Sequence, residues 1–518
     1  MAKKFMYEHD APIVDTNCGK VHGFMFDDVY TFKGIPYARA KRFKDPQRFT
    51  WDGVLECTNF NYACPVIEAP ALDHSIDFDR HLEVKSEECQ NLNIWTPGLD
   101  GAKRPVVVWL HGGGMSFGSS SEDGLCTGEN IAKYGDAVCV SVNHRLNILG
   151  YCDLSDFGDE YKNSANQGIA DMVFALKWVH ENIDKFGGDP GNVTLFGQSG
   201  GGMKVTTILQ TPAADGLFHK GVIMSGVQSE SMCDNHGSGK AMGNFLMKET
   251  GCKDVSELSK VSLDKLFAAA AKMRKEMKFK GFNTGETPTK NYYYMGDPSY
   301  AGFREETKNI PLFVGTTFGE FNATKSYAYE KHKMSDDVMR ARVEAEFGKE
   351  LADKIIPIFK EAYPARPLID VISADYLFRY YAKAYVKKRS ALNSCTYEYV
   401  FDQDMPMLGG VSPLHGNDLG FFFHTTEKAP GLNEPGVTEA VEDQVFKTFM
   451  AFARTGDPNN ETIPELLPSA PGKVNTIFFR KEPEVRVNFD DSLNAALSDA
   501  FLDEQEEFMR NAISGRLG

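Results

Sequence analysis

The sequence predicts an α/β fold: a large, mostly parallel central sheet flanked by helices, with helical insertions that form a cap around a pocket. Apolar strand-like runs alternate with helical stretches through residues 105–225, which favours a parallel sheet with helices on both faces. One of these strands runs into TLFGQSGGG (194–202), where a serine stands among glycines at a strand-to-helix turn. We expect residues 1–518 to form a single domain, with helical insertions at 230–300 and 334–391.

The composition is that of a globular protein with a large core, since 42% of residues are hydrophobic and 25% are charged. A formal net charge of −16 disfavours nucleic acid and anionic membranes as partners. We find no apolar run of about eighteen residues, and therefore expect no membrane span. The first residues, MAKKFMYEHDAPIV, lack the apolar stretch of a signal peptide, so we expect a cytoplasmic protein, with secretion after removal of a signal as the alternative.

The chain begins with short strand-like pieces and turns over residues 11–60, which we interpret as an antiparallel meander leading into the main sheet. Residues 65–88 are acidic and lack periodic apolar positions, so we expect a long loop. A strand at 91–97 follows. The run RPVVVWL (104–110) is typical of a strand buried on both faces, and it ends in HGGG (111–114). Successive glycines at a strand end allow backbone N–H groups to point into a cavity, as in an oxyanion loop.

A second strand (DAVCVSV) and a helix over 165–186 precede the strand at 193–197. The segment GQSGG that follows matches the G-x-S-x-G nucleophile elbow in its required context of strand, sharp turn and helix. The helix that begins after Ser199 directs its first N–H groups toward charge that develops on a substrate. Alone this motif is weak evidence, because small residues cluster in many turns. A further strand, GVIMSG, follows.

The later part of the chain supplies two more candidate residues. The strand in IPLFVGTTFG precedes Glu320, and His415 lies in a polar loop after the strand CTYEYVFD. The order serine, acid, histidine is that of α/β-hydrolases and differs from the order in chymotrypsin or subtilisin. Residues 230–300 contain helical pieces and several methionines, which we interpret as core residues, with an adaptable substrate pocket as the alternative. These methionines are Met232, Met242, Met247, Met273 and Met277. A last amphipathic helix at 442–456 and a strand region at 473–480 complete the pattern.

Together these pieces resemble the type-B carboxylesterases, the family that includes the cholinesterases, from about residue 12 to about residue 480. The similar segments include FKGIPYA, RFKDPQ, NLNIW, HGGG, WVHENIDKFGGDPGNVTLFGQSGGG, VIMSG, IPLFVGTTFGE, HGNDLGFFF and FARTGDPN. The resemblance implies an α/β-hydrolase fold with Ser199 as nucleophile, Glu320 as acid and His415 as base. It also implies that Gly113, Gly114 and Gly200 provide the oxyanion N–H donors. The supporting residues that it implies are Ser225, Gln198 and Asp418.

Three departures from the family pattern bear on the substrate and the compartment. Gln198 stands where the family's GESAG-like elbow has an acid, which implies a weaker preference for cationic alcohols. The loop between Cys64 and Cys89 lacks a tryptophan that could bind choline, so a choline ester is not expected. These two cysteines match the family's first disulfide pair, but Cys252 lacks the partner of the second pair. We therefore expect a reducing compartment and free thiols.

These observations predict a serine hydrolase that cleaves small to medium, uncharged or apolar carboxylic esters through an acyl-enzyme intermediate. The triad leaves amide, lactone or thioester hydrolysis open, and a non-catalytic binding protein on the same fold is the alternative from another class. The ten cysteines contain no C-x-x-C pair, and the proposed chemistry needs neither a metal nor an organic cofactor. No sequence feature indicates the oligomeric state.

Overall fold

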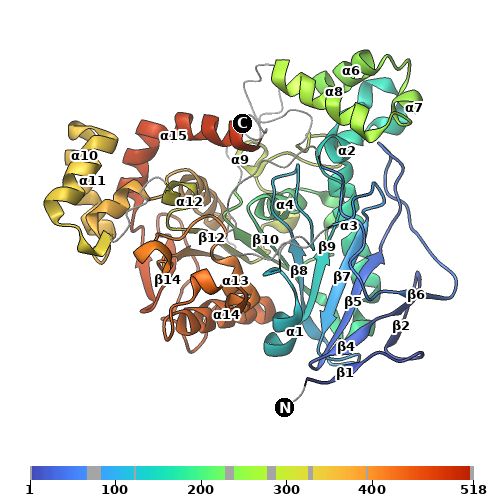
Figure 1. The fold of residues 1–518 in the computed structure, drawn as a ribbon, viewed down its shortest axis with the longest axis horizontal. Helices are drawn as coiled ribbons and strands as arrows, with labels where there is room; N and C mark the ends of the chain where they lie inside the picture. Colours follow the sequence, from blue (N-terminus) through green and yellow to red (C-terminus); the bar gives the residue numbers. More distant parts are fainter. Residues whose placement is uncertain are drawn as a thin grey trace.

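The computed structural model describes residues 3–66, 83–121, 124–227, 238–276, 287–324, 331–392 and 395–513. Its centre is a twelve-stranded sheet (Figure 1). In order across the sheet, the strands are β1 (Phe5–Met6), β4 (Phe24–Phe26), β5 (Val29–Pro36), β7 (Asn91–Thr96), β9 (Val138–Val142), β8 (Arg104–Leu110), β10 (Gly188–Gln198), β11 (Lys220–Met224), β12 (Leu312–Thr317), β13 (Thr396–Phe401), β14 (Asn475–Phe479) and β15 (Glu484–Val487).

The middle of this sheet is parallel. Every neighbouring pair from β9 through β8, β10, β11, β12 and β13 to β14 is parallel, whereas β1, β4, β5 and β7 at one edge and β15 at the other pair antiparallel. Helical crossovers join most of the parallel strands, as parallel pairing requires. The predicted α/β-hydrolase architecture, a large and mostly parallel sheet flanked by helices, is confirmed.

The expected single meander at the start of the chain is wrong. A separate three-stranded sheet contains β2 (Ile13–Thr16), β3 (Gly19–His22) and β6 (Val54–Glu56), and β3 pairs with β6 in parallel. The local antiparallel pairs β2–β3 and β4–β5 do occur. Local residue patterns predict strands and hairpins, but the partner of β6 is chosen by packing between distant segments, which those patterns do not encode.

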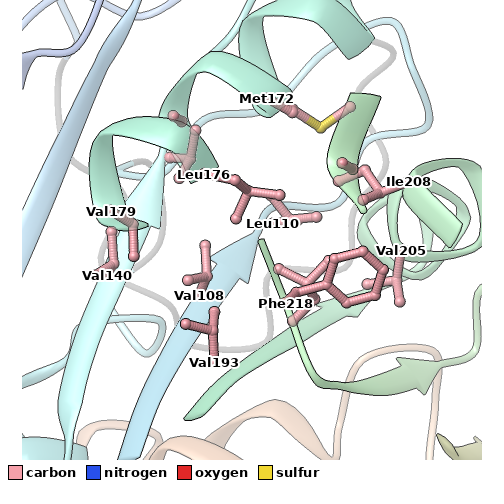
Figure 2. Close-up of a cluster of buried hydrophobic side chains, with 14 of the residues drawn as sticks. Val108, Leu110, Val140, Met172, Leu176, Val179, Val193, Val205, Ile208 and Phe218 are labelled. Carbon is pink, nitrogen blue, oxygen red and sulfur yellow. The ribbon is translucent and has the colours of Figure 1, made fainter. Parts of the chain in front are cut away.

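Helices cover both faces of the sheet, and alternate residues of β8 show how. Val106, Val108 and Leu110 face a core shared with α3 (Gln167–Asn182) and α4 (Gly200–Leu209), as Figure 2 shows for Val108 and Leu110. On the opposite face, Val107 and Trp109 belong to a core shared with α1 (Glu129–Gly135) and α14 (Thr438–Thr455). Burying both faces explains why this strand is almost continuously apolar. It also fixes the carboxyl ends of β8 and β10, where the glycine-rich segments begin.

Two groups of helices lie on opposite sides of the molecule in Figure 1. One group, beside α2 (Asn147–Tyr151), contains α6 (Ser238–Thr250), α7 (Val255–Leu258) and α8 (Leu263–Glu276). The short α9 (Pro298–Ala301) follows them in the chain. Met242, Met247 and Met273 are buried in one core cluster with these helices, in agreement with their interpretation as core residues. Met232, Met277 and residues 67–82 of the expected 65–88 loop lie outside the described residues.

The second group contains α10 (Asp336–Phe347) and α11 (Lys349–Ala362), followed in the chain by α12 (Phe378–Ser390) and the short α13 (Leu419–Phe423). The helix expected last, α14, is followed by another, α15 (Asp491–Ile513). The sequence pattern did not predict α15 because its apolar face is narrow: among its described side chains, the buried apolar ones are Leu493, Ala496 and Leu497, in a helix with many acidic residues. Within the described ranges, no helix combines the length and the apolar character that crossing a bilayer requires.

Candidate active site

Ser199 lies on the sharp turn between β10 and α4. Its backbone angles are φ 57° and ψ −124°, a region that residues with a side chain rarely occupy. The Ser199 N–H donates to Met224 O on β11 at 2.8 Å, and the residue is partly exposed. The turn therefore presents the serine at the carboxyl edge of the sheet, as the elbow motif predicts.

The glycines around Ser199 are required by close packing. A Cβ atom on Gly201 would collide with the backbone carbonyl oxygen of Leu110 at the end of β8. A Cβ atom on Gly200 would collide with the backbone of Gly114, and one on Gly197 with the backbone of Gly201. The elbow and the HGGG segment are thus in direct backbone contact, which a side chain at these positions would prevent.

Glu320 follows β12 and is fully buried. Its backbone φ is 46°, in the left-handed region, and the residue forms an isolated β-bridge with Leu414, which directly precedes His415. Ser225 Oγ donates to Glu320 Oε1 at 2.6 Å, and the Thr317 N–H donates to the same oxygen at 2.7 Å. The other oxygen, Oε2, is bonded to Nδ1 of His415.

The surroundings of Glu320 favour its charged form. Burial opposes ionisation, but the positive field of His415 and the donors just described outweigh it, so the pKa of Glu320 is lowered. An ionised carboxylate accepts hydrogen bonds only, and Nδ1 of His415 therefore carries the proton. This arrangement leaves Nε2, on the far side of the ring, free to act as an acceptor.

His415 lies in the loop between β13 and α13, where two aromatic rings hold its imidazole. The ring centroid of Phe321 is 4.4 Å from that of His415, and the centroid of Phe378 is 4.9 Å away. Leu414 N–H donates to Asn417 Oδ1 at 2.7 Å, which closes the turn around the histidine. Sequence reasoning missed both phenylalanines, although Phe321 directly follows the acid in sequence.

The side chain of Gln198 reaches the catalytic side of this imidazole. Its Nε2 lies 3.1 Å from Nε2 of His415, so the amide donates to the unprotonated ring nitrogen. Within the described residues, His415 has no hydrogen bond to Ser199 Oγ. The contact nevertheless places the imidazole against the residue that precedes the serine. The sequence indicated only that Gln198 removes a charge; the hydrogen bond is new.

The HGGG segment extends from β8 alongside the serine. A Cβ atom on Gly112 would lie 3.7 Å from Ser199 Cβ. Gly113 and Gly114 have φ angles of 83° and 59°, which L-residues rarely adopt. The carbonyl of Gly113 accepts from the N–H groups of Ser116 and Phe117 at 3.2 and 3.1 Å, so the loop closes on itself. The structure thus brings Gly113, Gly114 and Gly200 together beside Ser199.

Two buried carboxyl groups lie near the acid. Tyr399 donates its hydroxyl to Asp418 Oδ2 at 2.8 Å, and burial together with the charge of Glu320 raises the pKa of Asp418 to about 7. The same two causes, in the same order, raise the pKa of Asp375 to about 7. Asp375 was not identified from the sequence; it accepts from the N–H groups at the start of α12, and a lone aspartate before a helix is an ordinary cap.

A buried lysine on α4 was also missed. Lys204 is fully buried, and its Nζ donates to the carbonyl of His111 at 2.7 Å. A signal was present: it is a charged residue within GGGMKVTTIL, where every other residue is small, apolar or a threonine. Among the described residues, no cluster of three or more His, Cys, Asp or Glu side chains could hold a metal ion. Cys64 and Cys89 are buried free thiols, and burial, followed by the neighbouring Cys64, raises the pKa of Cys89.

Comparison with known proteins identifies the family. The carboxylesterase family model matches residues 10–489. The chain belongs to the carboxylesterase family. It is a carboxylic ester hydrolase, and the resemblance found in the sequence is confirmed.

Curated relatives cover nearly all of this carboxylesterase. A para-nitrobenzyl esterase of Bacillus subtilis (strain 168) is 31% identical over 460 residues, which cover 87% of this chain and 91% of the relative. Carboxylesterase 1D of Rattus norvegicus is 27% identical over 509 residues, covering 88% of each. Among solved structures, an esterase from anaerobic Clostridium hathewayi that can hydrolyse aliphatic aromatic polyesters matches with a TM-score of 0.92 and 39% identity. That match covers 96% of this chain and all of the other.

Proposed function

We propose that Ser199, His415 and Glu320 form the catalytic triad of this esterase. The observation that carries the proposal is the imidazole of His415, bonded to buried Glu320 through Nδ1 and placed at the elbow through Nε2. In the first step, Nε2 of His415 accepts the Ser199 proton as the serine oxygen attacks the ester carbonyl. Glu320 keeps the imidazole in the required tautomer and stabilises the imidazolium that forms.

The backbone N–H groups of Gly113, Gly114 and Gly200 are proposed to receive the negative charge on the tetrahedral intermediate. Their support is the contact between the HGGG segment and the elbow, and one such donor contributes about 3 kcal/mol in other hydrolases. His415 then protonates the leaving alcohol, and the acyl group remains on Ser199. A water molecule, deprotonated by His415, then attacks the acyl-enzyme; the bond to Ser199 breaks, His415 returns the proton to the serine oxygen, and the acid is released.

Ser225, Gln198 and Asp418 support the triad in this proposal. Ser225 donates to Glu320, which orients the carboxylate toward the imidazole. Gln198 brings a neutral amide where an acid would attract cations, so we propose small to medium, uncharged or apolar esters as substrates. The para-nitrobenzyl esterase relative is consistent with this class, and amide, lactone or thioester hydrolysis on the same triad is the second candidate.

We further propose a single domain over residues 1–518, with the segments 230–300 and 334–391 as helical insertions. A cytoplasmic location is proposed on the thiol state of the cysteines: each cysteine within the described ranges is unlinked, although ten occur in the sequence. Direct measurement of free thiols in the protein isolated from its native compartment tests this assignment.

Hydrolysis of p-nitrophenyl esters of graded acyl length tests the triad. We expect turnover by the parent to depend on chain length and to disappear in Ser199→Ala. Ser256→Ala, which changes an exposed serine of α7, is the matched control and should retain parental turnover. Residual enzymatic turnover in Ser199→Ala would contradict the assignment. Corresponding anilides and thioesters, assayed in parallel, distinguish ester hydrolysis from the second candidate.

A further inference from the structure

Lys204 is a fully buried lysine to which the proposed reaction assigns no role. Its Nζ donates to His111 O at 2.7 Å and lies 3.4 Å from Gly112 O. No acidic side chain within the described ranges forms an ion pair with it, and burial lowers the pKa of Lys204 well below its ordinary value. An unpaired buried lysine is costly, so its presence beneath a reactive loop calls for a compensating role.

The two carbonyls that Lys204 contacts belong to the peptides of the oxyanion loop. The carbonyl of His111 shares a peptide plane with the N–H of Gly112, and the carbonyl of Gly112 shares one with the N–H of Gly113. A donor at the oxygen end of a peptide strengthens the N–H at its other end, because hydrogen bonds in a chain polarise one another. Of these two N–H groups, that of Gly113 is a proposed oxyanion donor, and the bond to His111 O holds the residue at which the loop begins.

The side chain of His111 also contacts the carbonyl of Gly112. Its Nδ1 lies 2.9 Å from Gly112 O, and because a carbonyl only accepts, Nδ1 is protonated. His111 stacks on His144 with centroids 5.0 Å apart, and burial, then the neighbouring Lys204, lowers the pKa of both imidazoles. Both histidines are therefore neutral. The carbonyl of Gly112 thus receives a short hydrogen bond from one basic residue and a longer contact from another.

We propose that Lys204 is a positioning residue of the oxyanion hole: its bond to the carbonyl of His111 fixes the start of the glycine loop, and its contact with the carbonyl of Gly112 polarises the N–H of Gly113, one of the proposed oxyanion donors. This inference rests on the proposed function. A loop of three glycines has high conformational freedom, and the lysine restricts it from behind. The benefit is greatest when negative charge develops on the substrate, because preorganised donors then act without further reorganisation.

Lys204→Met tests the proposal, because methionine retains much of the side-chain length and removes the donor. Three quantities are measured with a p-nitrophenyl ester: kcat, KM, and the inhibition constant of an alkyl boronic acid, which forms a tetrahedral adduct with the serine. We expect kcat to fall about 10- to 100-fold and the boronate affinity to fall in parallel, with KM within about threefold of the parent. Lys220→Met is the matched control: Lys220 is a buried lysine on β11 whose Nζ bonds Asn192, and its loss should leave all three quantities unchanged.

A kcat within twofold of the parent in Lys204→Met would overturn the proposal, as would a lower kcat with unchanged boronate affinity. If Lys204→Met does not fold, Lys204→Gln, which keeps an N–H donor, replaces it. We then expect a smaller loss of kcat and a parallel, smaller loss of boronate affinity. Ser199→Ala in the same assay distinguishes a failure of the proposed triad from a failure of the proposed role of Lys204. Turnover in Ser199→Ala contradicts the proposed function itself, whereas an inactive Ser199→Ala beside a parent-like Lys204→Met contradicts only the role of the lysine.

Discussion

The amide nitrogen of Gln198 lies 3.1 Å from Nε2 of His415 and donates to the nitrogen that must accept the serine proton. The amide therefore contacts the reactive side of the imidazole directly, beside the serine. A carboxylate in place of the amide would put a negative charge beside the imidazole, and a negative charge at that distance favours the imidazolium.

Gln198→Glu should move the acidic limb of the pH profile of kcat/KM to higher pH, by about one unit. The profile is measured with an uncharged p-nitrophenyl ester. Gln47→Glu adds the same charge at an exposed position and should leave the limb in place. A limb that does not move in Gln198→Glu contradicts the inferred contact between the amide and the imidazole.

Glu320→Gln should lower kcat by a factor of about 10² to 10⁴ with little change in KM. The amide is nearly isosteric, but it can no longer hold His415 in the tautomer with the proton on Nδ1 or stabilise the imidazolium. Steady-state kinetics on the folded variant, verified by circular dichroism, measure the effect. Equal losses in Glu320→Gln and in an exposed change such as Glu88→Gln would show that the carboxylate has no special role.

Asp418→Asn should stabilise the protein at alkaline pH and not at acidic pH. The pKa of Asp418 is about 7 in the folded protein, raised by burial and by Glu320 from about 3.9 in the unfolded chain. Between these values the folded state binds a proton that the unfolded state releases, so this group's contribution to stability is complete below about pH 4 and is lost as pH rises through 7. Asparagine does not ionise, so the stability of the variant does not decrease with pH through this group.

The free energy of unfolding of Asp418→Asn, relative to the parent, should therefore increase between pH 4.5 and pH 8.5 by up to about 3 kcal/mol. Urea denaturation of both proteins at the two pH values measures it. A difference between variant and parent that is the same at both pH values would show that Asp418 is already ionised at the lower one.

Gly201→Ala should destabilise the fold by about 1 to 3 kcal/mol and reduce activity, because the new methyl group would force α4 away from the carbonyl at the end of β8. Thermal denaturation measures the change in Tm. Gly101→Ala is the control, since a Cβ atom there has no atom within 4 Å, and its Tm should match the parent's. Equal Tm values for the two variants would contradict the described packing of the elbow.

The residues of the proposed site could be predicted because the local structure around them restricts which residue types can stand next to them in the sequence. Ser199 requires glycines on either side of a strand-to-helix turn, and β8 and β10 are buried on both faces, which leaves long apolar runs. Glu320 and His415 follow strands of the same parallel sheet, so their order along the chain was informative. The spatial contact of Gln198 with His415 depends on a side-chain orientation, which residue types alone do not determine.

Other features could not be predicted because they arise from long-range packing. The pairing of β6 with β3 and the narrow buried face of α15 depend on distant segments. Asp375 resembles an ordinary helix cap in sequence, and its raised pKa comes from its burial and from the charge of Glu320, which only the structure shows. Lys204 was detectable as a charge in an otherwise uncharged helix, but its hydrogen bonds to the loop carbonyls required the structure.

The most direct test of the account is the rate and site of phosphorylation by diisopropyl fluorophosphate, followed by mass spectrometry of the digested protein. This reagent modifies a serine whose hydroxyl is activated by a neighbouring base. We predict one modified residue, Ser199, with a labelling rate that falls at least a hundredfold in His415→Ala. Modification of a different serine, or an equal rate in His415→Ala, would contradict the proposal that these residues act together.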